Sequence, residues 1–181
     1  MQARRHPFLI VAVVFLIAAS AAADRRRDPL TSAEVDQLRD TATEPELRLK
    51  LYVKFARARL ASLEEKRNEA KVTDRGRQTH DGLEDFLAVY DELNDNIDMY
   101  VDRKEDIRKP LKAVMEADTE FQAKLRALNS AAGATPQEKN EYQFVLTNAI
   151  ETLDSSADDH RKLMVEQEEA AKHKKKAPKG Q

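Results

Sequence analysis

The chain has 181 residues, of which 35% are charged, 6% are aromatic and only 4 are Gly, and it contains no Trp. This composition predicts one helical domain and disfavours a sheet, while 41% hydrophobic residues suffice to bury a core. The 31 basic and 33 acidic residues nearly cancel, so the chain lacks the positive excess typical of nucleic-acid-binding proteins. The absence of Cys excludes disulfides, thiolate zinc sites, cysteine nucleophiles and covalently attached c-type haem.

Residues 1–23 have the pattern of a secretory signal peptide. Arg4 and Arg5 precede an apolar run that is too short to span a bilayer, and small residues follow it up to Ala23. The pattern predicts cleavage after Ala23 and export to the periplasm or the cell exterior. The alternative is an uncleaved membrane anchor, which the arginines at 25–27 disfavour because they would lie on the exported side.

The mature chain begins with a flexible lead-in, residues 24–30, and continues with two helix starts. Thr31 followed by Glu34 fits a capping box, in which the two side chains satisfy free amides at the start of a helix. Residues 43–46, Thr-Glu-Pro-Glu, repeat the signature and place a proline in the first turn, where it removes no hydrogen bond. The second helix carries its apolar side chains at helical spacing: Leu49, Tyr52, Val53, Phe55, Ala56, Leu60 and Leu63.

The apolar pattern fades over residues 64–78, where we expect the chain to reverse direction. Asp81 followed by Glu84 is a plausible cap for the helix that comes next. From residue 81 to 131 apolar positions recur every seven residues on a broad stripe, typical of a bundle helix. One line of this stripe is Phe86, Leu93, Tyr100, Ile107, Val114, Phe121 and Leu128.

Pro110 is the only helix breaker within this stripe. Because the apolar lines keep their phase across it, the pattern favours one long central helix that is kinked at Pro110 and about 75 Å long at about 1.5 Å per residue. Two helices joined by a loop are the alternative.

Residues 129–135 end the central helix, and Thr135 with Glu138 forms a third capping box that opens the last helix. After residue 169 the chain becomes a basic tail, residues 170–181, with no apolar face, which we expect to be disordered. The sequence thus predicts an all-α fold over residues 31–169: an elongated three- or four-helix bundle with coiled-coil-like heptads.

Four acids of the central helix share one face: Asp91, Asp95, Asp98 and Asp102. They are candidates for binding calcium or another hard cation, although the segment lacks the alternating oxygen ligands and central Gly of an EF-hand. The interpretation we favour is a solvated outer face. A ladder of ion pairs between helices is also available, because the preceding helix carries Lys50, Lys54 and Arg57 at matching spacing.

Two histidines are candidates for chemistry. His80 lies beside Asp81 and Glu84, and His160 follows Asp158 and Asp159 on an inward helix face. No His has a Glu three residues before it, so the motif of a di-iron bundle is absent. We expect both to be hydrogen-bonded structural residues.

A serine nucleophile is a further possibility to consider. Ser155 or Ser156 with His160 would need a third group and an oxyanion pocket, and the sequence marks neither.

Polar residues also interrupt the central stripe, at Lys104 and Asp118, where they either fix pairing register or, for Lys104, extend along the edge of the apolar face.

The tail lysines offer weak contact with an anionic surface but lack the aromatic residues that stack on bases: Lys172, Lys174, Lys175, Lys176 and Lys179.

The sequence therefore predicts no catalytic, cofactor-binding or metal-binding residue. We expect an exported, non-enzymatic helical interaction or structural protein that binds an unknown protein partner or itself, with no nucleic acid and no stable membrane insertion after cleavage. The alternative is a periplasmic bundle that binds a small ligand or metal through its acidic face or through a pocket near His160.

Overall fold

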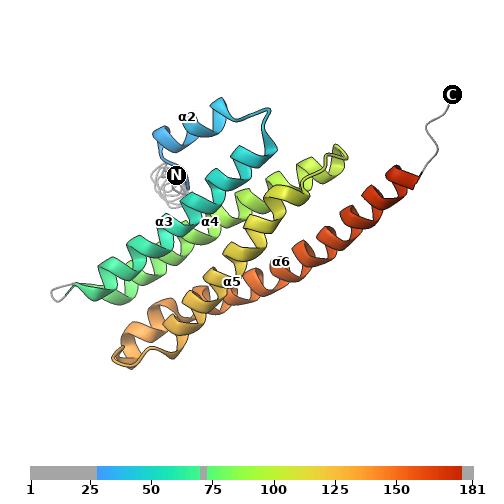
Figure 1. The fold of residues 1–181 in the computed structure, drawn as a ribbon. Helices are drawn as coiled ribbons and strands as arrows, with labels where there is room; N and C mark the ends of the chain where they lie inside the picture. Colours follow the sequence, from blue (N-terminus) through green and yellow to red (C-terminus); the bar gives the residue numbers. More distant parts are fainter. Residues whose placement is uncertain (1–27, 70–72, 177–181) are drawn as a thin grey trace, which may run out of the picture.

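The computed structural model describes residues 28–69 and 73–176 (Figure 1). Within these residues the chain forms α-helices and no strand, which confirms the predicted all-α class. The helices are α2 (Ser32–Asp40), α3 (Pro45–Asn68), α4 (Arg75–Asp102), α5 (Arg108–Ser130) and α6 (Pro136–Lys176). The predicted signal peptide, residues 1–23, and residues 24–27 of the lead-in lie outside the described residues.

The four long helices form an elongated bundle of two antiparallel hairpins, α3 with α4 and α5 with α6 (Figure 1). Helix α3 packs on both α4 and α5, and α6 also packs on both, so the consecutive helices α4 and α5 lie diagonally opposite each other. Helix α2 packs on α3. The predicted helical bundle is therefore confirmed, whereas its coiled-coil-like character stays a prediction.

Aromatic side chains fill the centre of the bundle. Phe86 of α4 meets Phe121 of α5 edge to face, with ring centroids 5.4 Å apart, and Tyr90 also lies against Phe121. Most of the predicted apolar line is buried to 1% exposure or less, through Leu93, Tyr100, Ile107 and Val114. Burial of this much apolar surface is the main source of stability in a chain without disulfides.

Two of the three predicted capping boxes are confirmed. The Thr31 amide donates to the Glu34 carboxylate at 2.8 Å, and the Glu34 amide donates back to the Thr31 hydroxyl. Thr135 and Glu138 exchange the same two bonds at the start of α6.

The other two predicted helix starts need correction. Glu44, which makes no side-chain cap bond, precedes α3, although Pro45 does occupy the first turn as expected. The predicted cap at Asp81 is wrong because α4 already begins at Arg75, after Asp74 in a left-handed conformation with φ of 60°. The Asp74 carbonyl accepts the Gln78 amide at 2.9 Å, which is a backbone hydrogen bond. The Asp74 side chain makes no cap bond.

The predicted continuous central helix, kinked at Pro110, is wrong. Helix α4 ends at Asp102 and α5 begins at Arg108, and Pro110 lies in the first turn of α5, where a missing amide leaves no hydrogen bond unmade. The break is at Lys104, whose φ of 58° takes the backbone out of the right-handed helical region.

The apolar line keeps its phase across this break because Ile107 is fully buried although it lies in the turn. The side chain of Gln167 in α6 holds this turn, which joins the two hairpins: its Oε1 accepts the Ile107 amide at 3.0 Å and its Nε2 donates to the Glu105 carbonyl at 3.1 Å. A periodic stripe therefore cannot distinguish a long helix from two helices that share one core.

Helix α6 is much longer than its neighbours, with 41 residues against 23 in α5. It continues to Lys176, past residue 169 where we expected the ordered bundle to end, and it projects beyond the turn between α4 and α5 (Figure 1).

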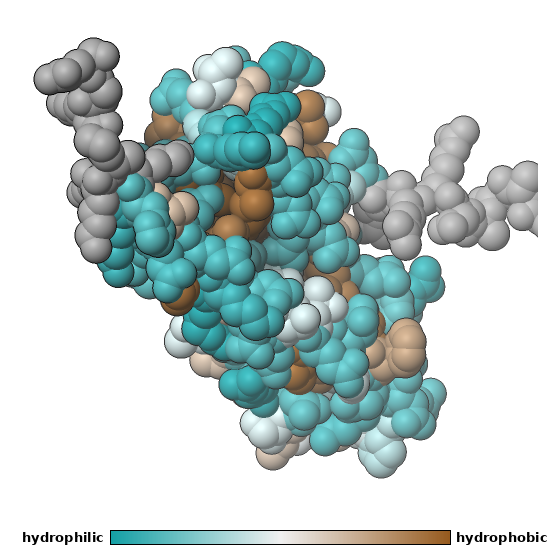
Figure 2. All heavy atoms as spheres, turned by 90° about the vertical axis from the view of Figure 1, so that its right-hand side faces the viewer, coloured by the Kyte–Doolittle hydropathy of each residue, from teal (hydrophilic) through white to brown (hydrophobic). Residues whose placement is uncertain are grey.

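The face in Figure 2 is mostly hydrophilic, with small hydrophobic areas between polar side chains. Among the described helices, none combines the length and the apolar character that a membrane span requires.

Candidate functional site

An open groove with a volume of about 1190 Å³ runs along the middle of α4. One wall is the face of α4 from His80 to Asp95, and the other includes Phe144, Val145 and Asn148 of α6; Asp28 and Pro29 also line the groove. The groove follows α4 over 16 residues, so its ends are about 22 Å apart at about 1.5 Å per residue. That length accommodates an extended peptide of about six residues.

Phe144 is the most exposed large apolar side chain among the described residues. It is 87% exposed, whereas Tyr142, Val145 and Leu146 on the inward face of the same helix are 1%, 6% and 0% exposed. Phe144 therefore contributes little to the core, and its side chain borders the groove instead.

Carboxylates dominate the rest of the groove. Seven acidic residues line it, and no Lys or Arg is present among its described lining residues. The acids are Asp28, Asp81, Glu84, Asp85, Asp91, Glu92 and Asp95. Within the described part of the chain, Asp85, Glu92 and Asp95 form no ion pair. The groove therefore presents a concentrated negative potential to solvent.

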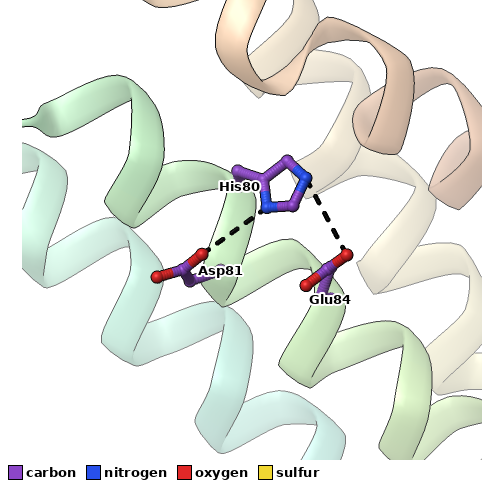
Figure 3. Close-up of side chains that lie close together, drawn as sticks. All are labelled: His80, Asp81 and Glu84. Carbon is purple, nitrogen blue, oxygen red and sulfur yellow. Dashed lines mark ion pairs between the residues drawn. The ribbon is translucent and has the colours of Figure 1, made fainter. Parts of the chain in front are cut away.

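His80, Asp81 and Glu84 gather at the N-terminal end of the groove (Figure 3). The distance from His80 Nδ1 to Asp81 Oδ1 is 3.5 Å, and that from His80 Nε2 to Glu84 Oε1 is 3.8 Å. One ligand atom from each residue lies within 4.8 Å of the other two. All three come from one helix and are at least one-third exposed, so the cluster offers one side of a coordination shell.

All four acids of the predicted face are exposed on α4, as expected for a solvated outer surface, and Asp91 and Asp95 also belong to the groove. The remaining two, Asp98 and Asp102, lie farther along the helix.

The charge ladder from α3 to this face, which the sequence left available as an alternative, does not form among the described residues. Lys50 pairs with Glu46 of its own helix at 2.7 Å, and Arg57 pairs with Glu120 of α5 at 2.8 Å. The bundle places the Arg57 side of α3 against α5, away from the acidic face.

A second polar constellation lies in the core, where Asp118 of α5 joins residues of α4 and α6. Its Oδ1 accepts the Tyr90 hydroxyl at 2.7 Å, and its Oδ2 lies 2.8 Å from Nδ1 of His160. Asp118 is 2% and His160 4% exposed. We call these three residues the core triad.

The core triad is a satisfied structural cluster. Burial, and then the neighbouring Asp118 carboxylate, raise the pKa of the Tyr90 hydroxyl far above its ordinary value, so Tyr90 remains a hydrogen-bond donor. The structure thus confirms the prediction of a hydrogen-bonded His160, and it shows that Asp118 lies inside the bundle rather than at an interface between chains.

The serines near His160 do not complete a catalytic arrangement in the described structure. Ser155 is exposed, and the Ser156 hydroxyl accepts the Asn94 side-chain amide at 3.0 Å. Asp118 supplies the third group that a triad would need, but the contact from His160 to a serine is not formed.

The interpretation that Lys104 extends along the edge of the apolar face is wrong, because Lys104 is an exposed turn residue. The candidate residues thus lie in three places: Asp118 and His160 meet in the core, Lys104 lies in the turn, and His80 lies at the groove. The expectation that His80 is also hydrogen-bonded is wrong within the described structure, since its contacts with Asp81 and Glu84 are 3.5 and 3.8 Å long.

Sequence reasoning missed Phe144. The available signal was that Phe144 lies between Tyr142 and Val145 but outside the helical spacing of the inward face, which leaves a large aromatic residue on the polar side.

Comparison with family models, with curated proteins and with solved structures found no match to this chain.

Proposed function

We propose that this protein is a non-enzymatic interaction protein that binds a positively charged protein segment in the groove between α4 and α6. The observation that carries the proposal is Phe144, a residue 87% exposed beside a wall of carboxylates. Exposed aromatic residues are frequent anchors of protein interfaces, because they bury a large area at a small entropic cost.

The charges around Phe144 favour one class of partner. Lysine or arginine side chains would pair with Asp85, Glu92 and Asp95, which form no ion pair within the described residues, while an apolar side chain covers Phe144. Such charge complementarity speeds encounter and selects against acidic partners. A cationic segment with an apolar residue fits both properties of the groove.

The proposed location is the periplasm or the cell exterior, after removal of residues 1–23. This part of the proposal rests on the sequence of residues 1–23, namely the basic start, the short apolar run and the small residues before Ala23. We include self-association among the interactions proposed, because a second copy of the chain also carries cationic segments.

The test uses a fluorescein-labelled peptide of alternating lysine and leucine and measures its fluorescence anisotropy with the full chain at low ionic strength. We expect saturable binding that weakens as salt is added, since the Debye length shortens. Phe144→Ala should weaken binding by about tenfold, which corresponds to about 1.4 kcal/mol for one aromatic anchor.

Val165→Ala is the matched control, because Val165 is an exposed apolar residue of the same helix, 55% exposed and outside the groove lining. Both substitutions should leave thermal stability nearly unchanged, so a change in affinity reports on binding. Absence of saturable binding to the full chain, or equal effects of the two substitutions, would refute the proposed function.

A second candidate function is cation binding at His80, Asp81 and Glu84, favoured by the proximity of their ligand atoms. Imidazole with carboxylates suits zinc or another divalent transition metal. A metal that binds only the folded protein would raise its melting temperature. We would measure thermal unfolding with calcium, zinc and ferrous iron for the wild type and for His80→Ala. Equal melting temperatures with and without every metal would eliminate this candidate.

A further inference from the structure

The chain itself contains a segment with the chemistry that the groove requires. Five lysines fall within residues 172–179, with His173 among them, and this is the most concentrated basic stretch of the chain. Residues 172–176 of this segment form the end of α6 and occupy about 8 Å at about 1.5 Å per residue, so they fit within the 22 Å or so of acidic wall along α4.

Helix α6 keeps this segment away from the groove of its own chain. Asn148 lies in the groove and Lys176 ends the helix, so the two are 28 residues or about 42 Å apart along one continuous helix. Residues 177–179, which complete the basic segment, add at most about 11 Å of reach beyond Lys176. The basic segment of one chain can therefore reach only the groove of another.

We infer that the groove binds the lysine-rich segment 172–179, which includes the end of α6 at Lys176, from a second copy of the chain. This inference rests on the proposed function and names its partner. Lysine ammonium groups of one copy pair with Asp85, Glu92 and Asp95 of the other, and lysine methylene groups cover the ring of Phe144. In an antiparallel dimer the two copies exchange these contacts reciprocally, since the groove is lined by residues near the start of α6 and the basic segment includes its end.

The test measures the mass of the full chain by light scattering after size-exclusion chromatography, over a range of protein and salt concentrations. The wild type should dimerise at low salt and dissociate as salt is added.

A groove variant combines Asp85→Asn, Glu92→Gln and Asp95→Asn. A tail variant changes all five lysines to Gln: Lys172, Lys174, Lys175, Lys176 and Lys179. Each variant alone should dimerise at least about tenfold more weakly, because three or more exposed ion pairs are lost from each contact.

Mixing the two variants gives the decisive result. The tail variant retains an intact groove and the groove variant retains intact lysines, so one of the two reciprocal contacts is restored and a heterodimer should form. The charge-matched control for the groove variant is Asp40→Asn, Glu65→Gln and Glu116→Gln, on exposed acids that form no ion pair among the described residues, and it should dimerise like the wild type.

Three results would overturn the inference: a wild-type chain that is monomeric at every concentration, a tail variant that dimerises as strongly as the wild type, or a mixture that forms no heterodimer. If the wild type dimerises through its groove but not through its lysines, the basic segment at 25–27, next to Asp28, is the first alternative occupant to test by substitution to Gln. The lysine–leucine peptide separates the two proposals, since its binding at Phe144 supports the proposed function even where dimerisation through residues 172–179 fails.

Discussion

Replacement of Asp118 by Ala should destabilise the bundle more than any exposed substitution. Asp118 is 2% exposed and accepts two hydrogen bonds, from the Tyr90 hydroxyl at 2.7 Å and from His160 at 2.8 Å. Hydrogen bonds to a charged group contribute about 1.5–3 kcal/mol each. Their loss also leaves two buried donors without an acceptor. Since removing one partner of a buried pair costs about 3–5 kcal/mol, we expect a loss of that size.

Asp118→Asn separates the charge from the shape of the side chain. Its amide oxygen still accepts the Tyr90 hydroxyl, while the amide nitrogen faces His160, whose Nδ1 can accept a hydrogen bond in the other tautomer. We therefore expect a cost of about 1–2 kcal/mol, well below that of Ala. A double-mutant cycle that combines Tyr90→Phe with Asp118→Asn measures how much of this cost depends on the hydroxyl.

Urea unfolding followed by circular dichroism at 222 nm measures these differences in a chain without Trp. Glu116→Ala is the control, because Glu116 is an exposed carboxylate on the same helix, and it should change the free energy of unfolding by about 0.5 kcal/mol or less. If Asp118→Ala costs less than about 1 kcal/mol, the core triad is not held together as described.

Two further predictions concern the ends of helices. Burial raises the pKa of Glu34, but hydrogen bonds from Arg59 and Thr31 outweigh it and lower the pKa below 4.5. The stability that Glu34 contributes should therefore be complete above pH 4.5 and lost as pH falls through the lower folded-state pKa. Urea unfolding of wild type and Glu34→Gln should differ more at neutral pH than at pH 3, and a constant difference would contradict the lowered pKa. Gly76→Ala should destabilise the chain by about 1 kcal/mol, because the new Cβ would lie 3.0 Å from the backbone carbonyl oxygen of Glu138 in α6, whereas the exposed Glu141 side chain can turn away. A gain in melting temperature, as expected for Ala in an unobstructed helix, would show that α6 gives way.

The sequence predicted a helix start best where the capping side chain and the backbone amide that it binds lie within four residues of each other. The boxes at Thr31 and Thr135 formed as expected because both partners belong to the same first turn. The start of α4 at Arg75 carries no such signal, since Asp74 adopts a left-handed conformation and its side chain makes no cap bond. Asp81 and Glu84 resemble a cap in sequence but lie inside the helix.

The break between α4 and α5 was missed for a different reason. Seven-residue spacing records which residues face a common core, and Ile107 faces that core from a turn. The conformation of Lys104 and the bonds from Gln167 depend on contacts made across the bundle. The sequence of residues 100–110 alone therefore does not predict the break. The one local signal is Pro110, which is favourable in the first turn of a helix and lies there in α5.

In the candidate site, too, single residues were predictable from the sequence, whereas contacts between helices were not. Asp118 and His160 were each identified from sequence as polar residues on apolar faces, but their contact joins residues 42 apart in the chain and depends on helix packing. The acids of α4 were identified as one exposed face. The groove was not, because its second wall comes from α6 and its most exposed member is Phe144.

The diagonal arrangement of α4 and α5 has a consequence for the order of folding events. Each antiparallel hairpin brings together segments that are neighbours in the chain, so α3 with α4 and α5 with α6 can form early, at low loop-closure cost. The core triad takes Tyr90 from one hairpin and Asp118 and His160 from the other. We expect it to assemble only when the two hairpins dock. Substitution of Asp118 should then accelerate unfolding and leave the refolding rate nearly unchanged, because the contacts of the core triad form after the transition state of folding.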